Sequence, residues 1–169
     1  SLSWTTKTYT GDVITTPEVT VKSGESSYTD FTVTVDPAEI KNAGEYKITV
    51  KPNGTTLNGD AITKTVIVNP ADFSKATITY TGSTLKDSFT GKDGSTKFAD
   101  LANNAEVTLP SGSSITVTGI DSAFYQEAKV TKKDANSIRI TVAKVTGLDN
   151  NVIGPPDKFI DIDLTTSLS

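Results

Sequence analysis

Hydrophobic side chains recur at every second position over much of this chain. Phe31, Val33 and Val35 alternate with Thr32 and Thr34, a pattern typical of a strand with one buried face. Clusters of Gly, Pro, Asn and Asp separate such segments about every 8–12 residues, the spacing expected of a β-sandwich. The alternation predicts strands over residues 4–9, 18–22, 31–35, 46–50, 61–68, 76–80, 105–109, 113–119, 138–142 and 159–164.

A candidate domain boundary lies after the fifth of these strands. The sequence Asn69-Pro70-Ala71-Asp72 ends the strand, because proline cannot continue a hydrogen-bonded ladder. The tetrapeptide Thr-Tyr-Thr-Gly occurs at Thr8–Gly11 and again at Thr79–Gly82, so strand-rich sequence restarts after the boundary. We therefore expect two domains, residues 1–70 and residues 71–169.

One segment of the second domain departs from the strand pattern. Phe98, Leu101, Ala102 and Ala105 are spaced i, i+3, i+4 and i+7, which predicts a short helix near residues 95–105. Ser95 is a candidate N-cap for it.

Composition favours an all-β chain. Thr accounts for 29 of the 169 residues, and this β-branched residue suits strands with one solvated face. Hydrophobic residues make up only 35%, which fits two thin sandwiches better than one thick core. The predicted architecture is two tandem immunoglobulin-like antiparallel β-sandwiches.

The charge and the missing residue types restrict the chemistry. The chain has no Cys, His or Met, so it lacks disulfides, thiolate nucleophiles and the commonest general base. A net charge of −4 argues against binding to nucleic acid or anionic membranes. We interpret the basic run Lys129, Lys132 and Lys133 as a solvated strand end or turn. No apolar run reaches membrane-spanning length, and the Ser-Leu-Ser at both ends suggests a fragment of a longer protein.

Three segments of the first domain carry a family resemblance. They are Tyr9-Thr10-Gly11, the stretch from Asn42-Ala43-Gly44-Glu45-Tyr46 to Val50, and Thr65 to Ala71-Asp72. Over about residues 4–73 the chain resembles bacterial immunoglobulin-like surface repeats of the MBG type, whereas the second domain keeps only the opening motif. The resemblance implies a cell-surface stalk, an adhesin or a surface-layer piece rather than an enzyme.

Two carboxylates and a nearby loop are the candidates for acid–base or metal chemistry. Asp161 and Asp163 stand two apart on a predicted strand and so share a face. We interpret that face as solvated. The alternative is a surface calcium site that includes Asp149, Asn150 and Asn151, although the usual calcium-loop spacing is missing. We expect no cofactor and no metal other than calcium.

A self-formed Lys–Asn crosslink is a further hypothesis. Lys7 lies on the first predicted strand and Asn69 ends the last strand of the first domain, and such strands can be neighbours in a sandwich. In the second domain the corresponding lysine is Lys75, with Asn150 or Asn151. The bond requires a neutral lysine in a dry core.

The aromatic side chains have two interpretations. Phe31 and Tyr46 are predicted to be core residues, while Trp4 is a candidate ligand contact. The predicted function is a structural or spacer segment of an exported bacterial surface protein, with neighbouring domains of the same chain as partners. The alternatives are an adhesin module that binds host or cell-wall glycans or proteins, and a viral immunoglobulin-like decoration domain.

Overall fold

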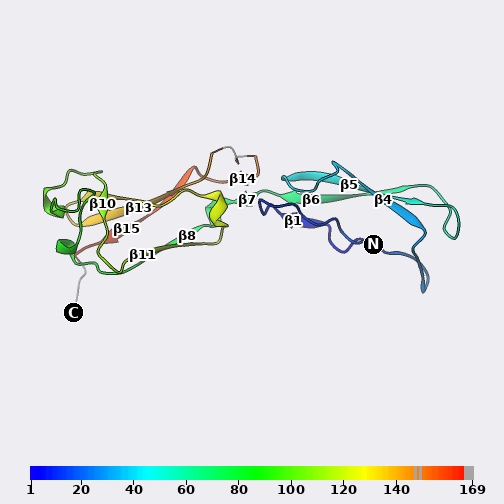
Figure 1. Ribbon diagram of the computed structural model, residues 1–169, viewed down its shortest axis with the longest axis horizontal. Coiled ribbons are helices and arrows are strands. Elements are labelled where there is room, and N and C mark those ends of the chain that lie inside the picture. The colour runs from blue at the N-terminus through cyan, green and yellow to red at the C-terminus, as the bar shows by residue number, and fades with distance from the viewer. Residues whose placement is uncertain (147, 149, 166–169) are drawn as a thin grey trace. The chain divides into compact units, whose positions relative to one another are not determined.

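The computed structural model describes residues 1–146, 148 and 150–165. Strands dominate these residues, and their only helical segments are single 3₁₀ turns. The all-β prediction is therefore confirmed. The chain forms two compact units, Ser1–Ala71 with Asp149–Val152, and Asp72–Leu148 with Ile153–Ser169 (Figure 1).

Unit 1 is built on one four-stranded sheet and a separate hairpin. The sheet has the order β1 (Thr6–Thr8), β6 (Ile62–Asn69), β5 (Gly44–Pro52) and β4 (Phe31–Asp36). The hairpin pairs β2 (Val21–Ser23) with β3 (Ser26–Tyr28), and ahead of it Leu2 bridges to Val19. β4, β5 and β6 lie side by side in Figure 1.

One strand pair departs from the prediction of antiparallel sheets. β1 runs parallel to β6, with Thr6 opposite Ile67 and Thr8 opposite Asn69. Hydrophobic alternation has the same period in both orientations, so it cannot indicate strand direction. The prediction that the first and last strands of this domain are neighbours is correct, and only their orientation was missed.

The core of unit 1 lies on one face of its sheet. Tyr46 and Ile48 of β5 are buried there, as are Val66 and Val68 of β6. Ile40, in the loop before β5, is also buried. Phe31 is only half-buried, so Tyr46 is the core aromatic and Phe31 lies at its margin.

Late residues of the chain complete unit 1. The backbone carbonyl of Asn151 accepts a hydrogen bond from the Ala71 amide at 2.8 Å. Its side-chain oxygen accepts another from the Ala43 amide at 2.7 Å. These bonds explain why Asp149–Val152 belongs to unit 1, although the sequence placed it in the second domain.

Unit 2 contains several small sheets joined by 3₁₀ turns. Its largest sheet has the order β12 (Lys129–Asp134), β13 (Ser137–Ala143) and β15 (Asp157–Asp163). Two pairs accompany it, β8 (Thr77–Thr81) with β11 (Ser114–Thr118) and β9 (Thr90–Gly91) with β10 (Val107–Thr108). The turns are η1 (Phe73–Lys75), η2 (Lys86–Ser88), η3 (Phe98–Asp100) and η4 (Ser122–Phe124), and the short strands β7 (Ala71–Asp72) and β14 (Val152–Ile153) pair with each other.

Aromatic side chains from the turns and aliphatic ones from β13 form the core of unit 2. Ile138, Ile140 and Val142 are fully buried on one face of β13. The rings of Phe89 and Phe98 meet edge to face, with their centroids 6.3 Å apart. The phenylalanines of the turns thus supply volume that the small sheets lack.

The helix predicted near residues 95–105 is reduced to the single turn η3. The Asp93 carboxylate accepts hydrogen bonds from the backbone amides of Ser95 and Thr96, at 3.0 and 2.9 Å. The Gly91 amide donates to the Thr96 carbonyl at 2.9 Å, and Thr90 forms an antiparallel bridge with Lys97. This pairing holds the residues before Phe98 extended, so the helix cannot begin there. Phe98 is buried as the helical pattern predicted, but through a turn.

In each unit the first residues lie beside the start of one strand, and the chain continues from the other end of that strand. Ser1 and Leu2 line one hollow together with Ile62, the first residue of β6, whereas the chain leaves unit 1 after Asn69, the last residue of β6. In unit 2, Lys158 near the start of β15 bonds to the carbonyls of Ser74 and Ala76. Leu164 and Thr165, the last described residues of unit 2, follow the opposite end of β15.

Candidate functional site

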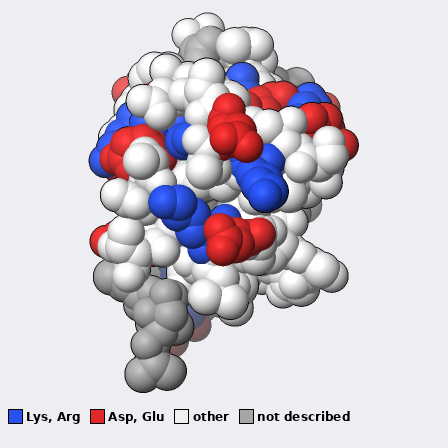
Figure 2. All heavy atoms as spheres, turned by 90° about the vertical axis from the view of Figure 1, so that its left-hand side faces the viewer, with Lys and Arg blue, Asp and Glu red and all other residues white. Residues whose placement is uncertain are grey.

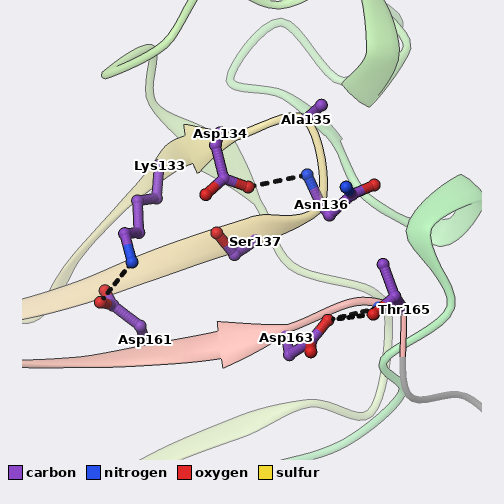
Figure 3. A pocket seen from close by; sticks show the side chains of 8 residues that line it. All are labelled: Lys133, Asp134, Ala135, Asn136, Ser137, Asp161, Asp163 and Thr165. Carbon is purple, nitrogen blue, oxygen red and sulfur yellow. Dashed lines mark hydrogen bonds and ion pairs between the residues drawn. The ribbon is translucent and has the colours of Figure 1, made fainter.

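A polar hollow of unit 2 lies where the β12–β13 turn meets the end of β15 (Figure 3). Its volume is about 480 Å³. Within it, Asp134 accepts a hydrogen bond from the Asn136 amide, and Asp163 accepts two from Thr165. The lining residues are Lys133, Asp134, Ala135, Asn136, Ser137, Asp161, Asp163 and Thr165.

Asp161 is the most heavily paired carboxylate of this hollow. Arg139, its cross-strand neighbour on β13, donates from two nitrogens at 2.8 and 3.1 Å. The ammonium of Lys133 lies 3.0 Å from the same carboxylate. The hydrogen bond from Arg139, reinforced by Lys133, lowers the pKa of Asp161 to about 2.

The other two carboxylates of the hollow are also held ionised. The Asn136 amide lowers the pKa of Asp134, and the Thr165 hydroxyl lowers the pKa of Asp163. Acid–base hydrolysis by paired carboxylates requires one carboxyl with a raised pKa to act as the acid. The shifts found here all go the other way, and they suit a charged, solvated strand face.

Of the residues proposed as calcium ligands, only some lie among the described residues. Asp149 lies outside them. Asn151 already uses its side-chain oxygen to accept from the Ala43 amide. No group of three Asp or Glu side chains among the described residues is arranged to hold a metal ion.

Lys132 is the residue that sequence reasoning interpreted wrongly. It is 4% exposed, whereas its neighbours Lys129 and Lys133 are exposed as expected. Its ammonium donates to the carbonyls of Phe98 at 2.9 Å and Leu101 at 2.7 Å, and it lies 4.9 Å from the centroid of the Phe98 ring. A third, longer bond reaches the carbonyl of Ala99 at 3.5 Å.

The reason for this burial is strand parity. Val130 and Lys132 occupy alternate positions on β12, opposite Ile140 and Ile138 of β13. Lys132 therefore faces the core, and its long side chain reaches the carbonyls of Phe98 in η3 and of Leu101 directly after it. The Val-Thr-Lys alternation was the available signal, but a run of basic residues usually indicates solvent.

The proposed crosslink residues are on adjacent strands but do not face each other. Lys7 is opposite Val68 and Thr8 is opposite Asn69, so Lys7 and Asn69 point to opposite faces of the sheet. Both side chains are exposed, as is Lys75, whereas the reaction requires a dry core. The Lys7 ammonium instead lies 5.9 Å from the centroid of the Trp4 ring.

Trp4 is half-buried and partly engaged within unit 1. Its indole N–H donates to the carbonyl of Thr15 at 3.2 Å. The polar edge of the ring is thus directed at its own chain, and the ring anchors the long loop after β1.

Charges of both signs alternate on the face drawn in Figure 2, with neither sign gathered in one continuous patch. Two of the ion pairs in unit 2 join Lys92 to Glu106 at 2.8 Å and Lys133 to Asp161 at 3.0 Å. None of the helical segments among the described residues is long and apolar enough to span a membrane.

Comparison with known proteins adds no relative. No protein family, curated protein or solved structure matches the chain. The geometry of the two units is therefore the basis for a functional proposal.

Proposed function

We propose that this chain is a structural spacer segment of an exported bacterial cell-surface protein, built from two tandem immunoglobulin-like units. One observation carries the proposal: in each unit the first residues lie beside the start of one strand, β6 or β15, and the chain continues from the other end of that strand. A unit of this kind holds its two neighbours along the chain apart by roughly the length of a strand, about 3.3 Å per residue.

The immunoglobulin-like assignment is supported by the motif around Tyr46. The Tyr46 hydroxyl donates to the carbonyl of Asn42 at 2.7 Å, and the Lys41 amide donates to the same hydroxyl at 3.2 Å. A strand tyrosine bonded to backbone a few residues upstream is the tyrosine corner of immunoglobulin-type sandwiches. This contact gives the Asn-Ala-Gly-Glu-Tyr sequence a physical role.

Intrachain partners of the polar side chains also favour a spacer. Asp161 is bound by Arg139 and Lys133, and Lys132 is bound by backbone carbonyls. Side chains that could have presented charge to a ligand instead hold strands and turns together.

Surface labelling of intact cells that make the protein tests the proposal. An antibody raised against the folded chain should label unbroken cells, and external protease should remove the label. Labelling that appears only after lysis would overturn the assignment. A glycan array probed with the same chain checks the adhesin alternative, and saturable binding that Trp4→Ala abolishes would favour that alternative over a spacer.

A further inference from the structure

We infer that the parallel ladder between β1 and β6 makes unit 1 a tension-bearing element. The inference deepens the proposed spacer function and rests on it. Three residue pairs form the ladder, from Thr6 opposite Ile67 to Thr8 opposite Asn69. A backbone bond closes each end, Ile67 N–H to the Thr5 carbonyl at 2.9 Å and Tyr9 N–H to the Asn69 carbonyl at 2.8 Å.

The direction of load depends on the strand orientation. A spacer under tension is pulled backwards at the residues before β1 and forwards at the residues after β6. Because the two strands are parallel, this force slides one strand along the other. All the ladder bonds then carry the load together, and none can break alone.

The hairpin β2–β3 provides a contrast within the same unit. Its strands are antiparallel and joined by a tight turn, so a force across its open end separates the pairs one after another. Bonds that break singly resist less force than bonds that must break together. A terminal hairpin in the same place would therefore yield at lower tension.

Side chains next to the ladder oppose sliding. Tyr9, directly after β1, is 6% exposed, and Val66 and Val68 of β6 are 0% and 1% exposed. Movement of β1 along β6 would draw the Tyr9 ring out of the core and expose its apolar surface to water. The buried Tyr9 ring therefore anchors the ladder at the C-terminal end of β1.

Among the described residues of unit 2, a side chain, not a backbone ladder, connects the first residues to the last strand. Its first residues meet its last strand through the Lys158 ammonium, which donates to the carbonyls of Ser74 and Ala76. In the described part of unit 2 no ladder joins β8 to β15, because β8 pairs with β11 and β15 pairs with β13. We expect unit 2 to give way before unit 1 when the whole chain is stretched.

Single-molecule force spectroscopy on the full chain tests the inference by pulling geometry. The chain contains no cysteine, so engineered cysteines provide unique handles. One variant carries Ser1→Cys and Asn69→Cys, which loads the ladder by sliding. The matched variant carries Asp12→Cys and Asn69→Cys, which pulls the adjacent ends of the two strands apart.

The sliding geometry should require a rupture force higher by at least about a factor of two, because the ladder bonds of parallel strands are evenly spaced and share that load. Equal forces in the two geometries would overturn the inference. Both variants keep the natural backbone of the ladder, so the comparison does not depend on a perturbed fold.

Two single proline substitutions test the contribution of one ladder hydrogen bond. The two closing bonds fix the alternation, so the Lys7 N–H points to β6 and the Thr8 N–H points away from it. Lys7→Pro removes a ladder bond, while Thr8→Pro, at an equally exposed neighbouring site, removes none.

Lys7→Pro should lower the rupture force in the sliding geometry to about half, and Thr8→Pro should leave it close to the natural value. Equal effects of the two prolines would contradict the inference. Surface labelling combined with a low rupture force would mean a spacer that bears no tension. Absent surface labelling would instead remove the proposed function and leave the mechanical result unaffected.

Discussion

At the scale of the residue, the buried Lys132 donates hydrogen bonds to backbone carbonyls at the end of a 3₁₀ turn. A 3₁₀ turn leaves carbonyls without intrahelical donors at its end. The Leu101 carbonyl, directly after η3, accepts from the ammonium of Lys132, and the Phe98 carbonyl accepts from both Lys132 and the Leu101 amide. Lys158 likewise donates to the carbonyl of Ser74, within η1, and to that of Ala76, directly after η1. A lysine thus bonds to the carbonyls of a 3₁₀ turn at two places in the described part of unit 2.

Lys132→Met tests this contribution. The variant keeps most of the side-chain volume but removes the buried ammonium's hydrogen bonds to the carbonyls of Phe98 and Leu101, which should cost about 3 kcal/mol of unfolding free energy. The matched control is Lys133→Met, which removes an exposed ion pair and should cost about 0–1 kcal/mol. Urea unfolding followed by circular dichroism measures both, and equal losses would refute the special role of Lys132.

Paired aspartates make stability depend on acidity. The pKa of Asp93 falls to about 2, chiefly through the Thr96 hydroxyl, and that of Asp161 falls to about 2 through Arg139. Each lowered pKa adds stability above the ordinary value of 3.8, and this stability is lost as the pH falls from 3.8 towards 2. Both groups lie at the surface, so solvent reduces the effect.

The measurement is the urea midpoint of unit 2 at about pH 5 and about pH 2. The natural chain should lose stability over this interval, and Asp161→Asn should lose less because the variant has no carboxylate to protonate. A steeper loss in Asp161→Asn than in the natural chain would show that ionised Asp161 does not stabilise unit 2.

At the scale of the element, Tyr46 fixes the turn that leads into β5. Its hydroxyl bridges the carbonyl of Asn42 and the amide of Lys41. Tyr46→Phe should destabilise unit 1 by about 1 kcal/mol, since the ring stays buried and only the hydrogen bonds go. Tyr28→Phe is the control, because Tyr28 is half-buried and its hydroxyl has no hydrogen-bond partner among the described residues. Thermal unfolding should separate the two variants.

The turn after β11 depends on a glycine for two separate reasons. Gly119 has φ of +85°, and a Cβ there would lie 2.3 Å from the Lys75 carbonyl oxygen. Gly112, just before β11, has nearly the same φ of +83° but faces open space. Gly119→Ala should therefore lower the melting temperature of unit 2 well beyond Gly112→Ala, and similar shifts would mean that the close approach is absent.

The strands could be predicted from the sequence because the alternation of hydrophobic and polar residues lies within each strand. Alternation predicted β4, β5, β13 and β15 to within two residues at each end. Alternation could not give the orientation of β1, because that depends on how distant segments return to one another. Alternation also missed the burial of Lys132, which depends on carbonyls in and after a turn more than thirty positions earlier in the chain.

At the scale of the whole molecule, the candidate site could be predicted only in part. Asp161 and Asp163 are exposed on one strand face, as their spacing indicated. Their partners Arg139 and Lys133 come from β13 and β12, and only the three-stranded register brings them together. The division of the chain near Ala71 coincides with the proline-containing boundary, but the return of Asp149–Val152 to unit 1 left no sequence signal.

Both proposals, the spacer and its resistance to tension, depend on the direction in which β1 runs beside β6. Nuclear magnetic resonance couplings across hydrogen bonds report that direction without any variant. The account predicts couplings from the Ile67 amide to the Thr5 carbonyl and from the Tyr9 amide to the Asn69 carbonyl. Couplings in an antiparallel register, or none between these strands, would contradict it.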